Sequence, residues 1–212
     1  MNVLPPLWVR RCAALAVGAV AVVASSVERS SSATQALCAP SGSQPKVGSL
    51  TRILHTTVFV DRIYVGAVPC DLVRGNVVRT DSRGEAVLRL SVAGRGTKCV
   101  VLPLAKTVTY PSAKPGAVVD FASGRSWCST SGGNGRSFFS AGGIKIAAVQ
   151  TMFGVDISRR VTVKVYSGSL RVNRTTLRSR MALVLSTTGK IIRGPSTAVF
   201  DAEDGLALAQ LR

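Results

Sequence analysis

The segment "LVRGNVVRTDSRGEAVLRL" (Leu72–Leu90) decides the fold class, because apolar residues alternate with other residues along both of its arms. Ala86, Leu88 and Leu90 share one side of an extended chain, and the residues between them occupy the other side. The polar bend "TDSRGE" (80–85) between the arms is rich in residue types that favour turns. The segment therefore predicts two half-buried strands joined as a β-hairpin.

The same alternation continues toward the C-terminus. "IKIAAVQTMFGVDISRRVTVKVYSGSLRVN" (144–173) predicts strands with a turn at Ser167–Ser169, and "MALVLSTTGKIIRG" (181–194) repeats the scheme. The composition agrees, because Val and Thr are frequent and favour pleated surfaces, whereas aromatic residues make up only 5%. We expect an all-β fold of short antiparallel strands, arranged as a sandwich, a roll or a solenoid. Only the last residues, "DAEDGLALAQLR" (201–212), have any helical character.

The N-terminal segment has the organisation of an export signal. Two arginines precede the apolar run Cys12–Ala24, which is shorter than the roughly 20 residues that a membrane-spanning helix needs. We expect a signal peptide over 1–24, a flexible Ser/Pro/Gly-rich linker over 25–50, a β-domain over 51–200 and a C-terminal tail over 201–212. The protein is then secreted or extracytoplasmic at the cell envelope; membrane anchoring through residues 12–27 is the alternative if the signal is not cleaved.

Cysteine usage is consistent with export. Loss of Cys12 with the signal leaves four well-separated cysteines, Cys38, Cys70, Cys99 and Cys128, and none forms a C-x-x-C pair. The single histidine of the sequence argues against Cys/His zinc clusters. We expect two disulfides, and of the three possible pairings we favour Cys38–Cys70 with Cys99–Cys128. Buried unpaired thiols are the alternative.

The chain is strongly basic, with a formal net charge of +17. Between Ile157 and Arg193 there are nine basic residues and no acidic one. Such an excess attracts anionic partners over long range, here an envelope protein or an anionic polymer of the wall or membrane. The alternative is that the arginines only solvate the outer strand faces. The predicted contact residues are Arg159, Arg160, Lys164, Arg171, Arg174, Arg178 and Arg180.

No catalytic, cofactor or metal motif accompanies this charge. His55 stands alone in an alternating segment, no G-x-S-x-G nucleophile elbow exists, and "DAEDG" (201–205) is interpreted as a solvated turn. Trp127 is expected to shield a disulfide at Cys128. Nucleic acid is not expected as a partner, because export argues against it and the basic segment lacks interleaved aromatic residues. We therefore expect a protein that is not an enzyme and has no cofactor.

Two groups of residues carry a resemblance to the FecR domain family. The resemblance extends over residues 51–194, with Gln150 where the family has a glycine before Thr151. The matching residues are Leu72, Gly75, Asn76, Val78, Arg79, Thr80, Asp81, Ala86, Leu88 and Leu90, then Thr151, Phe153, Val155, Val163, Val165, Gly168, Leu170 and Val172.

This resemblance implies an extracytoplasmic β-domain of the kind associated with sigma-factor and anti-sigma signalling. Family members that regulate transcription carry a cytoplasmic anti-sigma segment, and the few residues before Cys12 are too short to supply one. We therefore expect an exported binding or signalling module that recognises its partner through a β-surface, in one form by strand addition at an exposed edge. A structural or carbohydrate-binding component of the cell wall is the alternative.

Overall fold

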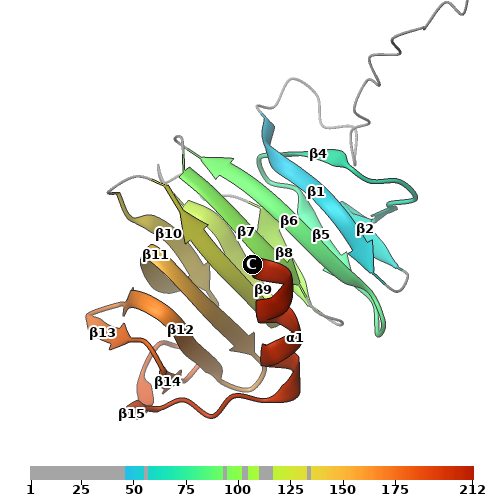
Figure 1. Ribbon diagram of the computed structural model, residues 1–212. Coiled ribbons are helices and arrows are strands. Elements are labelled where there is room, and N and C mark those ends of the chain that lie inside the picture. The colour runs from blue at the N-terminus through green and yellow to red at the C-terminus, as the bar shows by residue number, and fades with distance from the viewer. Residues whose placement is uncertain (1–45, 55–56, 93–94, 102–104, 110–116, 133–134) are drawn as a thin grey trace, which may run out of the picture. The chain divides into compact units, whose positions relative to one another are not determined.

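The computed structural model describes residues 46–54, 57–92, 95–101, 105–109, 117–132 and 135–212 (Figure 1). The expected signal peptide, most of the expected linker, Cys38 and His55 lie outside the described residues. The expected linker boundary at residue 50 is too late, because Val47 and Leu50 are buried residues of a strand that begins at Lys46. Within the described ranges, no helix is long and apolar enough to cross a membrane.

The described chain is built from strands and one C-terminal helix, which confirms the predicted all-β class. In chain order the elements are β1 (Lys46–Leu54), β2 (Val58–Val60), β3 (Ile63–Tyr64), β4 (Cys70–Val73), β5 (Val77–Thr80), β6 (Glu85–Val92), β7 (Arg95–Val101), β8 (Lys106–Thr109), β9 (Ala117–Ser131), β10 (Ser137–Ala141), β11 (Ile144–Ile157), β12 (Val161–Val172), β13 (Thr175–Arg178), β14 (Met181–Leu185), β15 (Ile191–Thr197) and α1 (Ala202–Leu211).

Strand pairing arranges these elements in two rows that share three long strands. Row A runs β4-β1-β6-β7-β9-β11-β12-β14-β15, and row B runs β3-β2-β5-β8-β9-β10-β11-β12-β13. All of these pairs are antiparallel except β9 with β10, which is parallel. The inward residues of both rows belong to one hydrophobic core, so the rows face each other as the two layers of a sandwich.

Strand β12 shows how a shared strand passes from one row to the other. Its buried residues are Val161, Val163 and Val165 in the first half, then Leu170 and Val172 in the second, so the inward set changes from odd to even positions. The change falls at Gly168, which has a φ of 80° and lies within a ladder that continues to β11 on both sides. The turn predicted at Ser167–Ser169 is therefore wrong: the ladder with β11 shifts register twice between Val149 and Phe153, and this bulged stretch keeps both halves of β12 facing the core.

The two neighbouring shared strands bend in the same manner. Gln150 of β11 and Gly124 of β9 also have positive φ values, 45° and 77°. Each lies between two strand halves whose inward residues differ in parity. Phe121, Phe139 and Phe153 fill the core beneath this crossing, with ring centroids 4.9–6.5 Å apart.

The segment Leu72–Leu90 does not form the predicted β-hairpin, although both of its arms are strands. β5 pairs with β2 and β8 in row B, whereas β6 pairs with β1 and β7 in row A. The bend between them is an arch that carries the chain from one layer to the other. Asp81 holds it by accepting hydrogen bonds from the amides of Arg83 and Gly84 at 3.0 and 2.6 Å, and Thr57 donates to the same carboxylate. The predicted inward side of β6 is confirmed, because Ala86, Leu88 and Leu90 are all buried in the core.

Helix α1 lies on the outer face of row A, over β7 and β9 (Figure 1). Ala207 and Leu211 of the helix pack on Val87, Val100 and Trp127, which point outward from β6, β7 and β9. The expected C-terminal tail is therefore a docked helix. The helix covers Val87, which is therefore buried although it lies on the opposite side of β6 from the core residue Leu88.

Candidate functional site

The loop between β11 and β12 and the edge strand β15 together form a basic depression on the outer face of row A. Arg159 and Arg160 lie in the loop, which is closed by a 3.0 Å hydrogen bond from the Ser158 amide to the Arg160 carbonyl. Arg193 and Ile192 reach the same depression from β15. We call it the outer hollow; its lining residues are Ser158, Arg159, Arg160, Thr162, Val184, Ile192 and Arg193.

A second depression lies on the other side of the same edge strand, where the two rows end. Lys145 and Arg174 supply its positive charge, and Ile191 of β15 lines it together with the core residues Val172 and Leu185. Asn173 braces this end, because its backbone N–H donates to the Lys145 carbonyl at 2.8 Å and its side chain accepts from the Lys145 amide at 3.2 Å. We call this depression the inner hollow.

Positive charge in the two hollows is not neutralised by the described part of the chain. No acidic residue lines either hollow. Among the ion pairs of the described residues, none involves Arg159, Arg160, Arg174 or Arg193. Like charges held close together at an exposed surface repel one another, and an anionic ligand relieves that repulsion. The hollows therefore suit an anionic partner.

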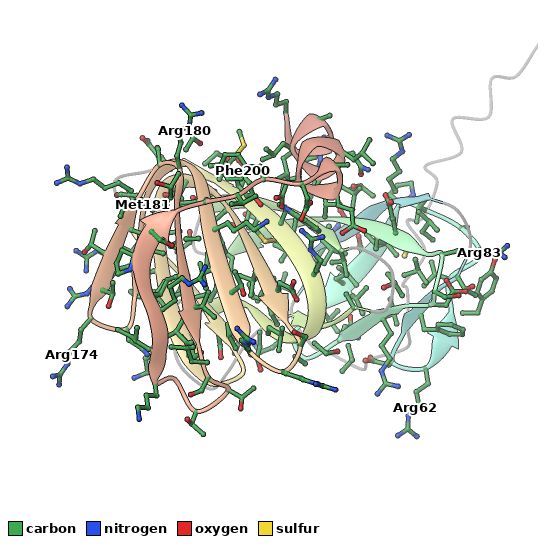
Figure 2. The ribbon with its side chains drawn as sticks, turned by 90° about the horizontal axis from the view of Figure 1, so that it is seen from below. Arg62, Arg83, Arg174, Arg180, Met181 and Phe200 are labelled. Atoms are coloured by element: carbon green, nitrogen blue, oxygen red, sulfur yellow. A yellow bond between two sulfur atoms is a disulfide. The ribbon has the colours of Figure 1, made fainter. Side chains whose placement is uncertain are left out.

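The remaining predicted contact residues do not join this site. Arg171 is exposed on β12 and donates through Nε to the Asn173 carbonyl at 3.2 Å. Arg178 and Arg180 flank the turn before β14, and Figure 2 places Arg180 beside Met181, far from Arg174. The seven predicted residues are therefore distributed over several surfaces and do not form one face. Lys145 was missed, because only the fold brings it beside the edge strand, and Arg193, the last residue of the acid-free segment, was not among the predicted contact residues.

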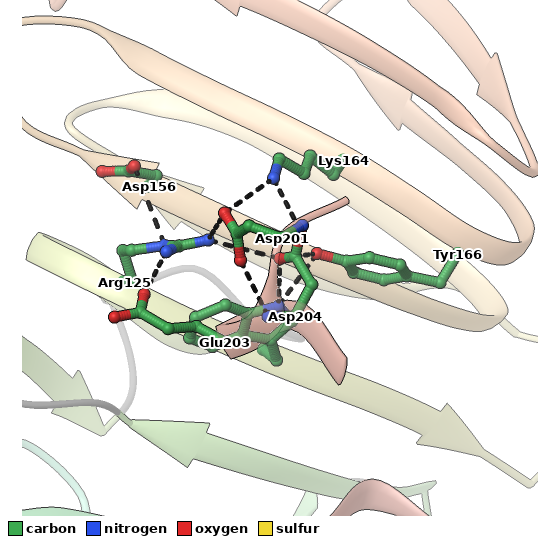
Figure 3. Close-up of polar contacts among 8 residues, drawn as sticks. Arg125, Asp156, Lys164, Tyr166, Asp201, Glu203 and Asp204 are labelled. Carbon is green, nitrogen blue, oxygen red and sulfur yellow. Dashed lines mark hydrogen bonds and ion pairs between the residues drawn. The ribbon is translucent and has the colours of Figure 1, made fainter. Parts of the chain in front are cut away.

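Lys164 was wrongly predicted to contact an anionic partner, because its side chain forms ion pairs with acidic residues of the same chain. Its Nζ lies 2.7 Å from Asp204 Oδ2 and 3.5 Å from Asp201 Oδ2, and its side chain is only 17% exposed. Lys164 points outward from row A beneath α1, where the acidic start of that helix covers it (Figure 3). It serves to dock the helix and is not open to an external anion.

Asp204 is the centre of this docking contact, and it is 1% exposed. Its carboxylate accepts hydrogen bonds from Tyr166 Oη at 2.5 Å, Lys164 Nζ at 2.7 Å, Trp127 Nε1 at 3.0 Å and Arg125 Nη2 at 3.3 Å (Figure 3). The amide of Asp201 donates to it at 2.9 Å, and the Asp204 amide donates back to Asp201 at the same distance. This reciprocal pair is a capping box at the start of α1.

The electrostatics of this cluster suit a structural role. Burial disfavours the charged form of Asp204, but hydrogen bonds from Lys164 and Tyr166 outweigh it and hold the pKa of Asp204 below its ordinary value. Burial, together with the hydrogen bond to Asp204, raises the pKa of Tyr166 far above its ordinary value, so the phenol remains a donor. Burial also raises the pKa of Asp156. The donors of β9 and β12 hold the Asp204 carboxylate in its charged form, and this cluster therefore fixes the helix to the sheet.

Two further sequence interpretations are corrected at this cluster. "DAEDG" is not a solvated turn, because its first and fourth residues cap a helix and the fourth is buried. Trp127 does not cover the disulfide, because adjacent strand residues point to opposite faces, and the indole lies beneath α1 with the Arg125 guanidinium 4.8 Å from its ring centroid. The Asp-x-x-Asp spacing before an apolar run was the signal available in the sequence.

The cysteine predictions are confirmed as far as the described residues reach. Cys99 of β7 and Cys128 of β9 form a disulfide between directly paired strands, with a Cα–Cα distance of 4.2 Å. Cys70 is also disulfide-bonded. The expected pairing with Cys38 concerns a residue outside the described part of the chain. Within that part, no group of three or more His, Cys, Asp or Glu side chains is placed to hold a metal ion.

Comparison with known proteins identifies similar solved structures only. No family model matches the chain, and no curated protein matches it. Similar solved structures include two crystal structures, at 1.65 and 2.50 Å resolution, of a candidate anti-sigma factor from Parabacteroides distasonis, with 12% sequence identity and TM-scores of 0.47 and 0.46. In both, the alignment covers 63% of this chain and 64% of the other, so the chain spans less than two thirds of those structures.

Proposed function

We propose that this protein is an exported, non-enzymatic binding module of the cell envelope that recognises an anionic partner at the edge of its β-sandwich. The observation that carries the proposal is the pair of basic hollows on either side of β15, whose linings contain no acidic residue. The partner is a protein with an acidic surface segment or an anionic envelope polymer. The FecR-like motifs in the sequence support a role in signalling, and the apolar N-terminal run supports export.

Recognition at this site is led by charge. Arg159, Arg160 and Arg193 converge on the outer hollow from two chain segments far apart in sequence. A rigid β-scaffold holds their backbones in place, so little order has to be gained when a partner binds. Attraction of this kind acts over roughly 10 Å at 0.1 M salt, and it weakens as salt increases.

Charge reversal tests the proposal directly. The triple variant Arg159→Glu, Arg160→Glu, Arg193→Glu is compared with a matched control, Arg62→Glu, Arg83→Glu, Arg89→Glu. The control carries the same change in net charge on exposed residues, and Figure 2 places Arg62 and Arg83 at the end opposite Arg174. The probes are poly-L-glutamate, purified teichoic acid and an uncharged chitin oligosaccharide.

The expected result is affinity for at least one anionic probe that falls about tenfold or more in the hollow variant and much less in the control. The affinity of the wild-type protein should also fall between roughly 0.05 and 0.5 M salt. Equal losses of affinity in both variants would mean that only net charge matters, and would contradict the assignment of binding to the outer hollow. Binding to the chitin oligosaccharide that survives high salt would replace the proposal with a carbohydrate-binding wall component.

A further inference from the structure

Strand β15 is the last strand of row A, and no described strand pairs with the side of β15 that faces away from β14. Every residue from Ile191 to Pro195 is exposed, and among the described strands only β14 pairs with β15. Two large apolar side chains lie on this edge, Ile191 at 49% and Ile192 at 54% exposure. An exposed edge with apolar residues is a template for another strand unless something covers it.

We propose, building on the binding function above, that β15 receives an extended acidic segment of a partner protein by strand addition. Ile191 lines the inner hollow, whereas Ile192 and Arg193 both line the outer hollow, because the ladder with β14 shifts register between Val184 and Leu185. Successive side chains of an added strand point to opposite faces, so they enter both hollows in turn. Because Arg174 and Lys145 lie on one side and Arg159 and Arg160 on the other, acidic residues fit at successive positions of the added strand.

Charge decides between this occupant and a second copy of the chain. Two copies pairing edge to edge through β15 would bring Arg193 of each molecule, with the arginines of both outer hollows, close to one another. Like charges directly opposite in a sheet are destabilising. An acidic strand meets the same groups with the opposite sign and gains charge-assisted contacts.

The edge also limits the length of the pairing. Pro195 has no backbone N–H to donate, and prolines at sheet edges restrict further pairing. The ladder with β14 shifts register between Ala182 and Val184 and again between Val184 and Leu185, so the pairing of β15 is irregular from Ile191 to Ser196. The added strand is therefore centred on Ile191–Gly194, which makes backbone pairing brief and leaves the charged side chains to supply much of the affinity.

Backbone methylation separates strand addition from charge attraction without altering the protein. The probe is a short blocked peptide of glutamate, valine and threonine, compared with the same peptide N-methylated at alternate amides. Methylation removes backbone donors and leaves the charge unchanged. The expected result is at least about tenfold weaker binding of the methylated peptide, together with slower amide exchange in β15 when the unmethylated peptide is bound.

Each other outcome is informative. Equal binding of the two peptides, with the charge-reversal effect intact, would overturn strand addition and leave the proposed function standing. Slower exchange at β13 or β4 instead of β15 would assign the added strand to another edge and also overturn the inference. Failure of both peptides and of poly-L-glutamate and teichoic acid to bind would overturn the proposed function itself.

Discussion

Trp127 Nε1 lies 3.0 Å from Asp204 Oδ1, joining two residues that are 77 positions apart in the sequence. This contact fixes α1 to the sheet through a buried polar group, since Ala207 and Leu211 supply only a small apolar surface beneath it. A helix as short as Ala202–Leu211 is not stable alone in water, and Gly205 weakens it further. The helix therefore exists because it is docked.

Replacing Asp204 by Ala is expected to release the helix. The substitution leaves Lys164 and the Trp127 indole without their buried acceptor, and removal of one partner from a buried charge pair costs roughly 3 kcal/mol or more. The free energy of unfolding from urea titration should fall by about that amount. The emission of Trp127 should move to longer wavelength, measured in a Trp8→Phe background so that a single tryptophan reports.

The matched control is Glu203→Gln in the same helix turn. Glu203 pairs with Arg125 but its side chain is 55% exposed, so the change should stay within about 0.5 kcal/mol. Similar losses in the two variants would mean that general helix charge, and not the buried carboxylate, holds α1 in place.

Acid is expected to undock the same helix. Burial opposes ionisation of Asp201 and Asp204, but hydrogen bonds and nearby cations outweigh it, so both pKa values lie below the ordinary value. Such groups stabilise the folded state above the unfolded-state pKa of about 3.9, and this stabilisation is lost as pH falls through the lower folded-state pKa. Asp156 acts in the opposite direction, because burial raises its pKa, and it offsets part of the loss.

The measurement is Trp127 emission and urea stability between about pH 6 and pH 2. The wild-type protein should lose stability toward the acid end, and the Asp204→Asn variant should start lower and show a shallower dependence. A wild-type stability that is constant or rises as pH falls over this range would contradict the assignment.

The sequence predicts those features of this fold that depend on residues close together in the chain, and it fails for features that depend on distant residues. Alternation is local, so the inward side of β6 could be identified correctly. Pairing partners are not local, and the arch at Asp81 has the same turn residues as a hairpin. The bulge at Gly168 was taken for a turn because both contain a glycine with positive φ and both interrupt alternation.

Only the positive charge of the candidate site could be predicted from the sequence. The acid-free segment indicated an anionic partner, but the fold sends Lys164 under the helix and Arg180 away from Arg174. It also brings Lys145 into the site from another strand. Which arginines share a hollow depends on strand register and on the bends of the shared strands, and neither follows from residue spacing alone.

The Cys99–Cys128 disulfide should contribute substantially to stability. It joins residues 29 positions apart, and closing a loop of that size in the unfolded chain corresponds to about 3–4 kcal/mol. The double variant Cys99→Ala, Cys128→Ala should unfold at lower urea by that free energy. When both proteins are reduced, which also opens the disulfide of Cys70 in each, most of the gap between them should close. A gap that persists under reducing conditions would attribute the loss to the missing sulfur atoms in the core.

Replacement of glycine by alanine should have opposite effects on stability at Gly168 and at Gly205, because the backbone conformations of the two positions differ. At Gly168, with a φ of 80°, an added Cβ would lie 2.6 Å from the Gln150 carbonyl oxygen in the bent part of β12. At Gly205, inside α1, an added Cβ has no heavy atom within 4 Å. Gly168→Ala should therefore destabilise the protein by about 2 kcal/mol or more, and Gly205→Ala should stabilise it by roughly 0.5–1 kcal/mol.

Urea unfolding of the two variants beside the wild-type protein checks both signs. The stabilisation at Gly205 should appear only while α1 is docked, so it should disappear when Asp204→Ala is added, since an undocked helix gains nothing from a better helix former. Full additivity of Gly205→Ala and Asp204→Ala would show that the helix persists without its buried carboxylate. A neutral Gly168→Ala would mean that β12 bends elsewhere than at this bulge, and the passage of the shared strands between the two rows would then need another explanation.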